Sequence, residues 1–536
     1  MQGFMTKSSK KRASTPNFVS PSQLVLEGFE TPFSKQLNAN NRWVKLAHQI
    51  PWDQICNIYT KKVGLSHTGR PPISPRIVIG SLIIKHICNL DDRETVAQIS
   101  ENMYMQYFLG YSSFTAEPPF DASLFVEFRN RMGLEQINAI NEKVVAMANA
   151  LAAAKEEKKA AAQKKEEKDD DSADQEPASS EEQQSEGESA GQELAPMPEN
   201  NGRVLLDATC CPQDIAYPTD LNLLSEAREK TEELIDHLFN PELHCKKKPR
   251  TYRETARKEF LKVAQKKKKG RSVLRSGIGK QINYLARNLK TIHKLLDGYT
   301  TFPLNARQQK YLLVVSTLLE QQQAMHKART HSVEHRIVSI HQPHVRPIVR
   351  GKTTAKTEFG AKIHVSLVEG YAFLDELSWD AFNEGSHLMS YIERYRNRFG
   401  CYPAQVLADQ IYCTRENRRQ LKEKGIQLLA KPLGRPSAVN KSHVSPGERN
   451  PIEGKFGQAK VAYGLDNIKA RLKETSQSWI ACIFLVLNLV KLAGQAPLRF
   501  IFREVKMSFS AAMSLSLFSI FLPAQIKFSG SGPGRF

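Results

Sequence analysis

The sequence predicts an α/β protein: an all-α region followed by a mixed five-stranded sheet that a long helical insertion interrupts. Three observations predict this fold class. Residues 41–150 carry helical patterns and no strand-like run. After residue 203, short apolar runs of strand length alternate with helical patterns, which is typical of α/β proteins. Between the first two of these runs, residues from about 222 to 345 are mainly helical in pattern and strongly basic.

The all-α region begins after about 40 polar residues that we expect to be loosely ordered. Ile77–Leu90 is apolar on most faces, as in a buried helix, and the prolines just before it suit a helix start. Arg93–Ser100 and Met103–Leu109 are two short helical stretches with a break between them. The pair is compatible with a DNA-reading helix-turn-helix, although two ordinary packed helices are the favoured interpretation.

An acidic segment of low complexity, residues 153–202, separates the two structured parts. Its first part is a plausible solvated helix, and the remainder has almost no apolar residues with which to form a core. Residues 166–200 carry thirteen Asp or Glu and one Lys, a local net charge of −12. We expect a flexible linker. A polyanion mimic that competes for basic surface is the less favoured alternative.

The charge of the whole chain points to a polyanionic partner. It has 76 Lys and Arg against 56 Asp and Glu, a net of +20, which becomes +32 without the acidic segment. Such a chain attracts nucleic acid or an anionic membrane. The longest apolar runs, Trp479–Leu492 and Ala511–Leu522, are interrupted or too short to span a bilayer. We therefore expect an intracellular protein without a membrane segment.

The cysteines and the N-terminus agree with an intracellular location. The basic N-terminus leads into no apolar core, so no secretory signal is expected. Eight cysteines show no C-x-x-C pair and no metal-finger spacing, so we expect reduced thiols and no structural zinc.

The apolar runs from residue 203 onward define the expected sheet. With the insertion set aside, the order is β-β-β-α-β-α-β-α, which is the plan of the ribonuclease-H fold. The second and third strands form a hairpin through Glu369-Gly370, and Gly400 caps the helix that follows. The expected strands are VLLDATCC from Val204, Ala361–Gly370, Tyr371–Trp379, Ala404–Asp409 and Ile426–Lys431, and the later helices are His387–Gly400, Arg415–Gly425, Glu448–Ala462 and Ser476–Ala493.

Three carboxylates occupy informative places in this order. Asp207 closes the first strand after VLL, Asp409 closes the strand VLAD, and Glu453 lies on the helix after the last strand. Together they would form an oxygen-rich site suited to Mg²⁺ or Mn²⁺, with two ions able to activate and stabilise the oxygens of a phosphodiester. A single Asp after a strand is most often a turn residue or a helix cap, so the pattern alone leaves both interpretations open.

The helix that carries Glu453 has two cations on the same face. Arg449, Glu453 and Lys460 fall at i, i+4 and i+11, which is one stripe of a helix. The carboxylate can bind metal while the cations hold phosphates. The alternative is a solvated face with ion pairing, although Pro451 and two glycines argue against a helix built only for stability.

Other sequence patterns are weaker evidence for a function. His331 and His335 are spaced i, i+4, but the Glu between them is wrongly placed for a zinc-protease motif, and polar or DNA-facing histidines are favoured. Lys266–Lys269 favours nonspecific DNA contact over a merely solubilising run. The sequence has no Gly-rich nucleotide loop, which indicates that ATP is not the energy source.

Several blocks resemble one family of DNA-processing enzymes. Residues 70–111 (RPPISPRIVIGSLIIKHICNL…YFLGY) and FDASLFVEFRNRMG resemble the N-terminal domain of InsH-like DDE transposases of the insertion-sequence-five family. LLDATCCPQDIAYPTDLNLLSEARE, VLADQIYCTRENRRQLKEKGI and RNPIEGKFGQAKVAYGLDNIKARL are similar to its three catalytic blocks, in the same order.

The resemblance implies a ribonuclease-H-like catalytic domain that uses Mg²⁺ or Mn²⁺, with two ions held by Asp207, Asp409 and Glu453. It implies strand cleavage and strand transfer at terminal inverted repeats, joining to double-stranded target DNA, and a homodimer on paired ends. Arg449, Lys455 and Lys460 would hold DNA. A cytoplasmic, nucleoid-associated protein of a bacterium or archaeon is expected. In a related Tyr-Arg-Glu-Lys signature the Tyr position is Pro446 here, so any role of that Tyr is not carried over.

The expected domains are 1–40 as a flexible N-terminus, 41–152 as a helical domain that binds DNA ends, 153–202 as the linker, 203–495 as the catalytic domain with its insertion, and 496–536 as a tail. The leading hypothesis is a metal-dependent transposase. A noncatalytic DNA-binding remnant and a structure-specific nuclease are the alternatives.

Overall fold

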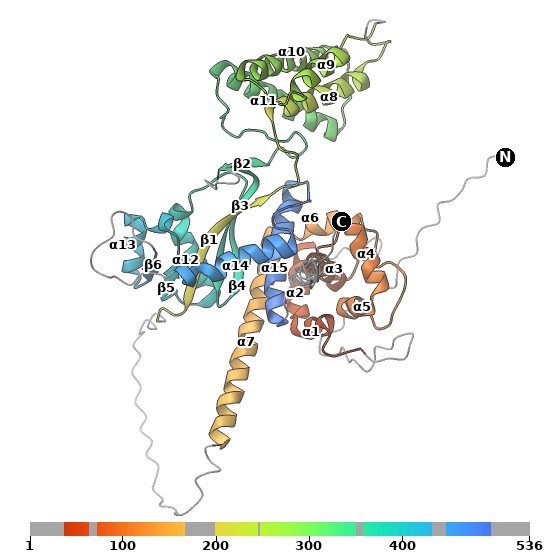
Figure 1. Cartoon of the computed structure of the whole chain (residues 1–536). Coiled ribbons are helices and arrows are strands. Elements are labelled where there is room, and N and C mark those ends of the chain that lie inside the picture. The colour runs from red at the N-terminus through yellow and green to blue at the C-terminus, as the bar shows by residue number, and fades with distance from the viewer. Residues whose placement is uncertain are drawn as a thin grey trace, which may run out of the picture.

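The structure is a computed structural model, and it describes residues 37–63, 72–166, 199–244, 247–349, 357–430 and 446–494 (Figure 1). The predictions for the N-terminus up to residue 36, for most of the acidic linker, and for the tail with the apolar run Ala511–Leu522 lie outside these ranges.

The region before the linker is helical, as the sequence predicts. α3 begins with Pro75 in its first turn, has most of its side chains buried, and ends where Asn89 takes a left-handed conformation with φ of 51°. α7 continues to Glu166, into the start of the acidic segment. The helices are α1 (Arg42–Gln49), α2 (Trp52–Val63), α3 (Pro75–Cys88), α4 (Asp92–Glu101), α5 (Met103–Leu109), α6 (Leu124–Arg131) and α7 (Leu134–Glu166).

The helix-turn-helix interpretation of α4 and α5 is wrong. A single residue, Asn102, separates the two helices, and its side chain accepts hydrogen bonds from the backbone N–H groups of Tyr104 and Met105 to cap α5. Five of the seven residues of α5 are buried. A recognition helix must expose a face to the major groove, so α5 is a core helix.

A mixed sheet of six strands follows, which confirms the α/β class but corrects the expected five strands. β3 pairs antiparallel with β1 on one side and with β2 and β4 on the other, while β5 and β6 extend the sheet parallel to β1. The strand that the sequence did not reveal is β2. The strands are β1 (Arg203–Pro212), β2 (Arg346–Val349), β3 (Thr357–Val368), β4 (Tyr371–Ser378), β5 (Gln405–Leu407) and β6 (Gln427–Leu429).

The central pair of strands, β1 and β3, corrects the position of one predicted site residue. β1 continues to Pro212, and Asp207 pairs with Val365 in the middle of it, so Asp207 does not close the strand. Near the end of the pair, Gly360 leaves room for β1, because a Cβ there would lie 2.0 Å from the carbonyl oxygen of Cys211. The hairpin between β3 and β4 is confirmed. Glu369 and Gly370 have φ of 49° and 78°, as a two-residue turn with two left-handed residues requires.

The two faces of the sheet bury different cores. On one face, Val204 and Leu206 of β1 pack with Tyr391 and Ile392 of α12 (Leu388–Phe399), and Leu421 of α13 (Arg415–Glu423) joins them. Gly400, with φ of 78°, ends α12 as predicted. On the other face, Val365 of β3 and Leu374 of β4 belong to the cluster of α15 (Lys473–Leu492).

α15 joins the sheet to the N-terminal helices. It packs against β4 and also against α3, α6 and α7 (Figure 1). Its buried residues include Trp479, Phe484 and Leu487, which lie in one hydrophobic cluster with Ile79, Ile83 and Phe108 of the N-terminal helices. By length and composition alone α15 could cross a membrane, but 83% of its most apolar stretch is buried in the protein, as is usual for a core helix.

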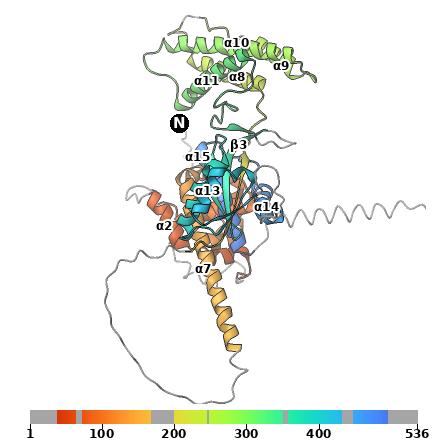
Figure 2. The same ribbon diagram turned by 90° about the vertical axis from the view of Figure 1, so that its left-hand side faces the viewer.

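The insertion between β1 and β2 is a bundle of four helices with a core of its own. Figures 1 and 2 show it beyond one end of the sheet, joined to it by two chain segments, with α10 on the side away from the sheet. The helices are α8 (Asp220–Leu238), α9 (Arg253–Ala264), α10 (Arg271–Leu296) and α11 (Ala306–Ala328). The predicted helical character of this segment is confirmed.

Candidate active site

The predicted site residues lie where α14 (Pro446–Tyr463) passes along β1. At the start of β1, Arg203 forms an ion pair with Glu448 in the first turn of α14. Beyond the helix, Ile468 forms a parallel bridge with Gln213, just past the end of β1. α14 and the segment after it therefore follow β1 along its whole length.

Asp207 sits on β1 with its side chain 20% exposed. Its Oδ1 accepts a hydrogen bond of 2.7 Å from the backbone N–H of Ala208. Its Oδ2 accepts one of 3.4 Å from the Nη2 of Arg449 on α14. The carboxylate is thus held between the backbone of its own strand and the neighbouring helix.

Asp409 lies two residues past the end of β5, at the level of Asp207. The parallel register that pairs Leu205 with Leu407 carries both chains forward side by side. Oδ1 of Asp409 accepts a hydrogen bond of 2.8 Å from the backbone N–H of Gln410. The same oxygen lies 3.2 Å from Nη1 of Arg449. One guanidinium therefore bridges the two aspartates.

The electrostatics of Asp207 favour a nearby cation. Its pKa is raised above the usual value, mainly because burial penalises the charged form, and the charges of Glu384 and Asp409 raise it further. The N–H of Ala208 and the charge of Arg449 act in the opposite direction without cancelling the effect. Additional positive charge at this point would stabilise the ionised carboxylate.

Glu453 is not gathered with the two aspartates. Its side chain is exposed, and it lies four residues after Arg449, about 6 Å further along the helix axis. Among the described residues, no group of three or more His, Cys, Asp or Glu side chains is arranged to hold a metal ion. The structure brings together Asp207, Asp409 and Arg449, and it leaves Glu453 one helical turn away.

The chain matches two protein families. Residues 31–131 match the family described as "Transposase domain (DUF772)", and residues 406–490 match the one described as "Transposase DDE domain". The two matches together indicate a DDE transposase of an insertion sequence. Asp409, Arg449 and Glu453 fall inside the second match, whereas Asp207 and the helical insertion lie outside both.

The transposase also resembles one curated protein, "Uncharacterized protein ORF8 in nfe locus" of Rhizobium meliloti. The identity is 28% over 194 residues, which cover 36% of this chain and 71% of that protein. No solved structure shows significant similarity to the chain.

A fourth carboxylate, which the sequence did not reveal, lies close enough to influence Asp207. Glu384 begins a short 3-10 turn, η3 (Glu384–His387), and its side chain is only 15% exposed. It forms an ion pair of 2.7 Å with Lys362 of β3, and it accepts a hydrogen bond of 3.4 Å from the hydroxyl of Tyr412. The local sequence, Asn383-Glu384-Gly385, is typical of a polar turn, so it does not identify Glu384 as a site residue.

The two lysines predicted to bind DNA differ in their surroundings. Lys455 is half-buried, and its pKa is lowered by burial and by the charge of Lys491 on α15, so it lies toward α15. Lys460 is half-buried near the end of α14, on the same stripe as Arg449. Lys455, which was not part of the predicted stripe, therefore differs from Lys460 in its position on the helix.

The histidines of the insertion do not converge. Nδ1 of His331 lies 3.5 Å from Asp220, whereas Nδ1 of His335 lies 3.5 Å from Asp380. Their nearest carboxylates belong to different parts of the chain, so the described geometry does not bring the two histidines to one site.

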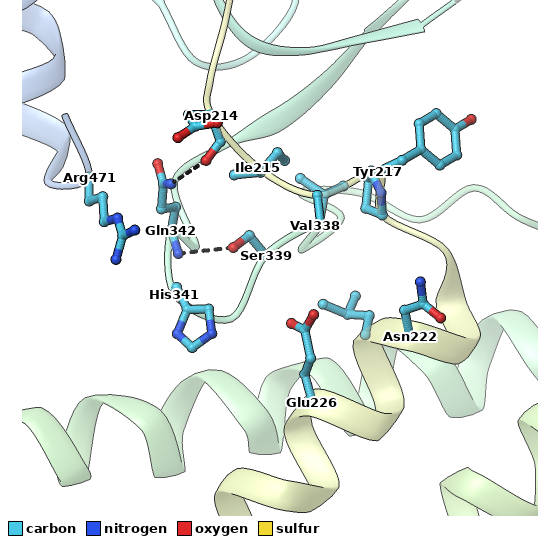
Figure 3. A pocket seen from close by; sticks show the side chains of 13 residues that line it. Asp214, Ile215, Tyr217, Asn222, Glu226, Val338, Ser339, His341, Gln342 and Arg471 are labelled. Atoms are coloured by element: carbon cyan, nitrogen blue, oxygen red, sulfur yellow. Dashed lines mark hydrogen bonds between the residues drawn. The ribbon is translucent and has the colours of Figure 1, made fainter. Parts of the chain in front are cut away.

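A cavity of about 300 Å³ lies at the junction between the insertion and the sheet (Figure 3). His341 and Gln342 come from the segment that returns to the sheet, Glu226 from α8, and Arg471 from the segment after α14. Burial raises the pKa of Glu226, whereas burial and the nearby cations lower the pKa of His341. None of the predicted site residues lines this cavity.

Proposed function

We propose that this transposase cleaves DNA strands at the ends of an insertion sequence in a metal-dependent reaction and transfers them to target DNA. The observation that carries the proposal is the meeting of Asp207 and Asp409, from neighbouring parallel strands, at a residue of the helix that bears Glu453. The match to a DDE transposase domain, which contains Asp409 and Glu453, supports the same assignment.

The catalytic region is proposed to have the ribonuclease-H-like fold. The sheet order supports this: three antiparallel strands, β4, β3 and β1, extended by β5 and β6 parallel to β1. In open sheets of this kind, functional groups gather at the carboxyl ends of neighbouring parallel strands. Asp409 follows the end of β5 in this way, and Asp207 reaches the same level from within β1.

The residues present fit a divalent cation in two respects. Asp207 and Asp409 offer the oxygen ligands that Mg²⁺ and Mn²⁺ prefer. The pKa of Asp207 is raised mainly by burial, so a bound cation would stabilise its ionised form. We assign Asp207, Asp409 and Glu453 to hold two ions, which would activate a water or a 3′-hydroxyl and stabilise the leaving oxygen.

Arg449 has two roles in this proposal. Without metal, its guanidinium holds the two aspartates side by side and offsets their repulsion. With the aspartates neutralised by metal, the same fork of N–H donors is available to a phosphate of the DNA, which it can bind in a bidentate manner. Lys460, on the same helical stripe, and Lys455 extend the positive charge along α14.

The proposed partners are the terminal inverted repeats of the element and double-stranded target DNA, bound by a homodimer that pairs two ends. The net charge of +20 supports a polyanionic partner. A cytoplasmic, nucleoid-associated location follows from the same partner.

The proposal is tested by cleavage of labelled DNA that carries the element's own ends, with Mg²⁺ and with EDTA. Asp207→Asn, which keeps the size of the side chain, should abolish Mg²⁺-dependent cutting while DNA binding in EDTA is retained. Asp214→Asn, an equal change beyond the end of β1, is the matched control and should leave cutting intact. Cleavage by the Asp207 variant would contradict the site.

The same assay separates the two alternative functions. Joined strand-transfer products exclude a nuclease that only cuts. DNA binding by the wild-type protein without any cutting in Mg²⁺ or Mn²⁺ would instead identify a noncatalytic remnant.

A further inference from the structure

The insertion carries the most concentrated positive charge in the described chain. We call Arg253–Arg275, which comprises α9, the loop after it and the first turn of α10, the basic hairpin. It holds ten Lys or Arg against two Glu, a net of +8 in 23 residues. The hairpin lies outside both family matches, so neither assigns it a role.

The structure folds this segment into a true hairpin. α9 runs antiparallel along the first part of α10: Tyr252 lies beneath the guanidinium of Arg287, and Glu259 pairs with Lys280 at 2.7 Å. Further on, a Cβ at Gly277 would touch Val263 near the end of α9. The turn between the helices, Lys266–Lys269, is fully on the surface.

Most of these cations form no ion pair with a carboxylate of the described residues. Arg253 is paired with Asp236 at 2.7 Å. The remaining exposed cations form no ion pair with any described Asp or Glu; they are Arg257, Lys258, Lys262, Lys266, Lys267, Lys268, Lys269 and Arg271. Surface charges of one sign so close together repel one another, and a polyanion would relieve that repulsion.

The local helix electrostatics are also unfavourable without an anion. Lys258 and Lys262 are like charges at i, i+4 on the exposed side of α9, which destabilises a helix. α10 begins with Arg271 next to the positive end of the helix dipole, its first turn has no acidic residue, and its cap Gly270 supplies no side-chain acceptor. Negative charge at the hairpin turn would offset all three effects.

The hairpin turn lies at the end of the bundle where the chain enters and leaves it. Asp220 at the start of α8 accepts a hydrogen bond from Gln322 in the last part of α11. His326, one turn later, contacts the carbonyl oxygen of Arg275 in α10 at 3.3 Å. The start of α8, the end of α11 and the hairpin turn are therefore neighbours, so the charge lies near the connections to the catalytic sheet.

We infer that the basic hairpin is a second DNA-binding surface of the transposase, which holds the phosphate backbone of duplex DNA outside the carboxylate site. The inference rests on the proposed function, because it extends the contact of one DNA partner from α14 to the insertion. Duplex DNA is the favoured occupant because it presents one negative charge per about 1.7 Å. The only large exposed hydrophobics described on or beside the hairpin are Tyr252 and Val273, too few for a protein-docking face.

The test uses the full-length protein and a labelled 30-base-pair duplex of arbitrary sequence, in EDTA, over a range of KCl concentrations. Lys266–Lys269 are all changed to Gln, which is expected to leave the fold intact because the turn is exposed. The matched control removes four exposed cations at the opposite end of the bundle: Lys290, Lys294, Arg307 and Lys310 to Gln.

Each phosphate contact contributes about 0.9 to the slope of log affinity against log salt. We expect the hairpin variant to lose about 2–3.6 from the magnitude of that slope and at least about tenfold in affinity at 100 mM KCl. The control should change either quantity far less. An unchanged slope in the hairpin variant, or equal losses in both variants, would overturn the inference.

Cleavage of element ends with Mg²⁺, measured separately, distinguishes a failure of this inference from a failure of the proposed function. If the wild-type protein cuts element ends with Mg²⁺ while the hairpin variant binds DNA normally, the inference alone fails. If the wild-type protein never cuts while the hairpin variant loses its salt dependence, the proposed chemistry fails and the DNA surface stands.

Discussion

Replacement of Arg449 by Gln should strengthen the binding of divalent metal in the absence of DNA. The guanidinium lies 3.4 Å from a carboxylate oxygen of Asp207 and 3.2 Å from one of Asp409, so a metal ion must displace it from both. The substituted amide would keep a polar group on a side chain of similar reach but would not compete as a cation. The sign of the effect follows from this competition.

The magnitude follows from the exposure of the three groups. At an effective dielectric of about 20, Coulomb's law gives about 5 kcal/mol for one such pair before solvent screening. Arg449 and Asp207 are each 20% exposed and Asp409 is 57% exposed, so solvent screening reduces each pair toward about 1 kcal/mol. The loss of one or two such pairs should tighten metal binding by about 5- to 30-fold.

Titration calorimetry of the full-length protein with Mg²⁺ and with Mn²⁺ measures this directly. Arg203→Gln is the matched control, because Arg203 pairs with Glu448 on the same helix but touches neither aspartate in the described contacts. Equal or weaker metal binding by the Arg449 variant would refute the competition between the guanidinium and the metal. Equal tightening in both variants would show that the loss of one positive charge, and not the removal of a competing group, causes the effect.

Three further predictions concern other parts of the molecule. Glu384→Gln should lower the pKa of Asp207, because the charge of Glu384 raises it; since metal binding needs the ionised carboxylate, the loss of cleavage on acidification should move to lower pH in a pH–rate profile. Phe484→Ala, at a side chain 1% exposed, should cost about 3–5 kcal/mol in the free energy of unfolding measured by denaturant. Gly360→Ala should cost about 1–3 kcal/mol in the same measurement, because its Cβ would lie 2.0 Å from the oxygen of Cys211; an unchanged midpoint in either variant would contradict the packing.

The sequence predicted best where one local pattern decides the element. The hairpin at Glu369-Gly370 needs two left-handed residues, and the end of α12 at Gly400 needs one. The residue types at these positions therefore predict the turn and the helix end directly. Ser476–Ala493 was predicted as a helix, within three residues of the observed start of α15 at Lys473.

The errors share a different cause, which is pairing with distant parts of the chain. The strand VLLDATCC was predicted with nearly its observed extent, but Asp207 was interpreted as closing it, whereas β3 pairs with β1 as far as Pro212. β2 is four residues long, contains Pro347, and exists only because it pairs with the start of β3. No periodicity within Arg346–Val349 could reveal that partner.

In the candidate site, too, local sequence context identified some residues, whereas contacts between distant parts of the chain were missed. The two aspartates were identified from their similar apolar contexts, and the structure places them on one guanidinium. The bridging role of Arg449 was missed because it depends on how α14 lies across the ends of two strands. Glu384 was missed because its influence on Asp207 arises through space, from a turn more than 170 residues away in the chain.

The hydrophobic core that α15 forms with both the sheet and the N-terminal helices limits which parts of the transposase can move during DNA processing. α15 is buried by β4 on one side and by α3, α6 and α7 on the other, so separating the N-terminal helices from the sheet would expose most of its apolar surface. The insertion, in contrast, has a separate hydrophobic core and is joined to the sheet by two chain segments beside a cavity. A change of shape on binding DNA therefore costs least at that junction, where the basic hairpin can adjust to the duplex while the carboxylates stay fixed to the sheet.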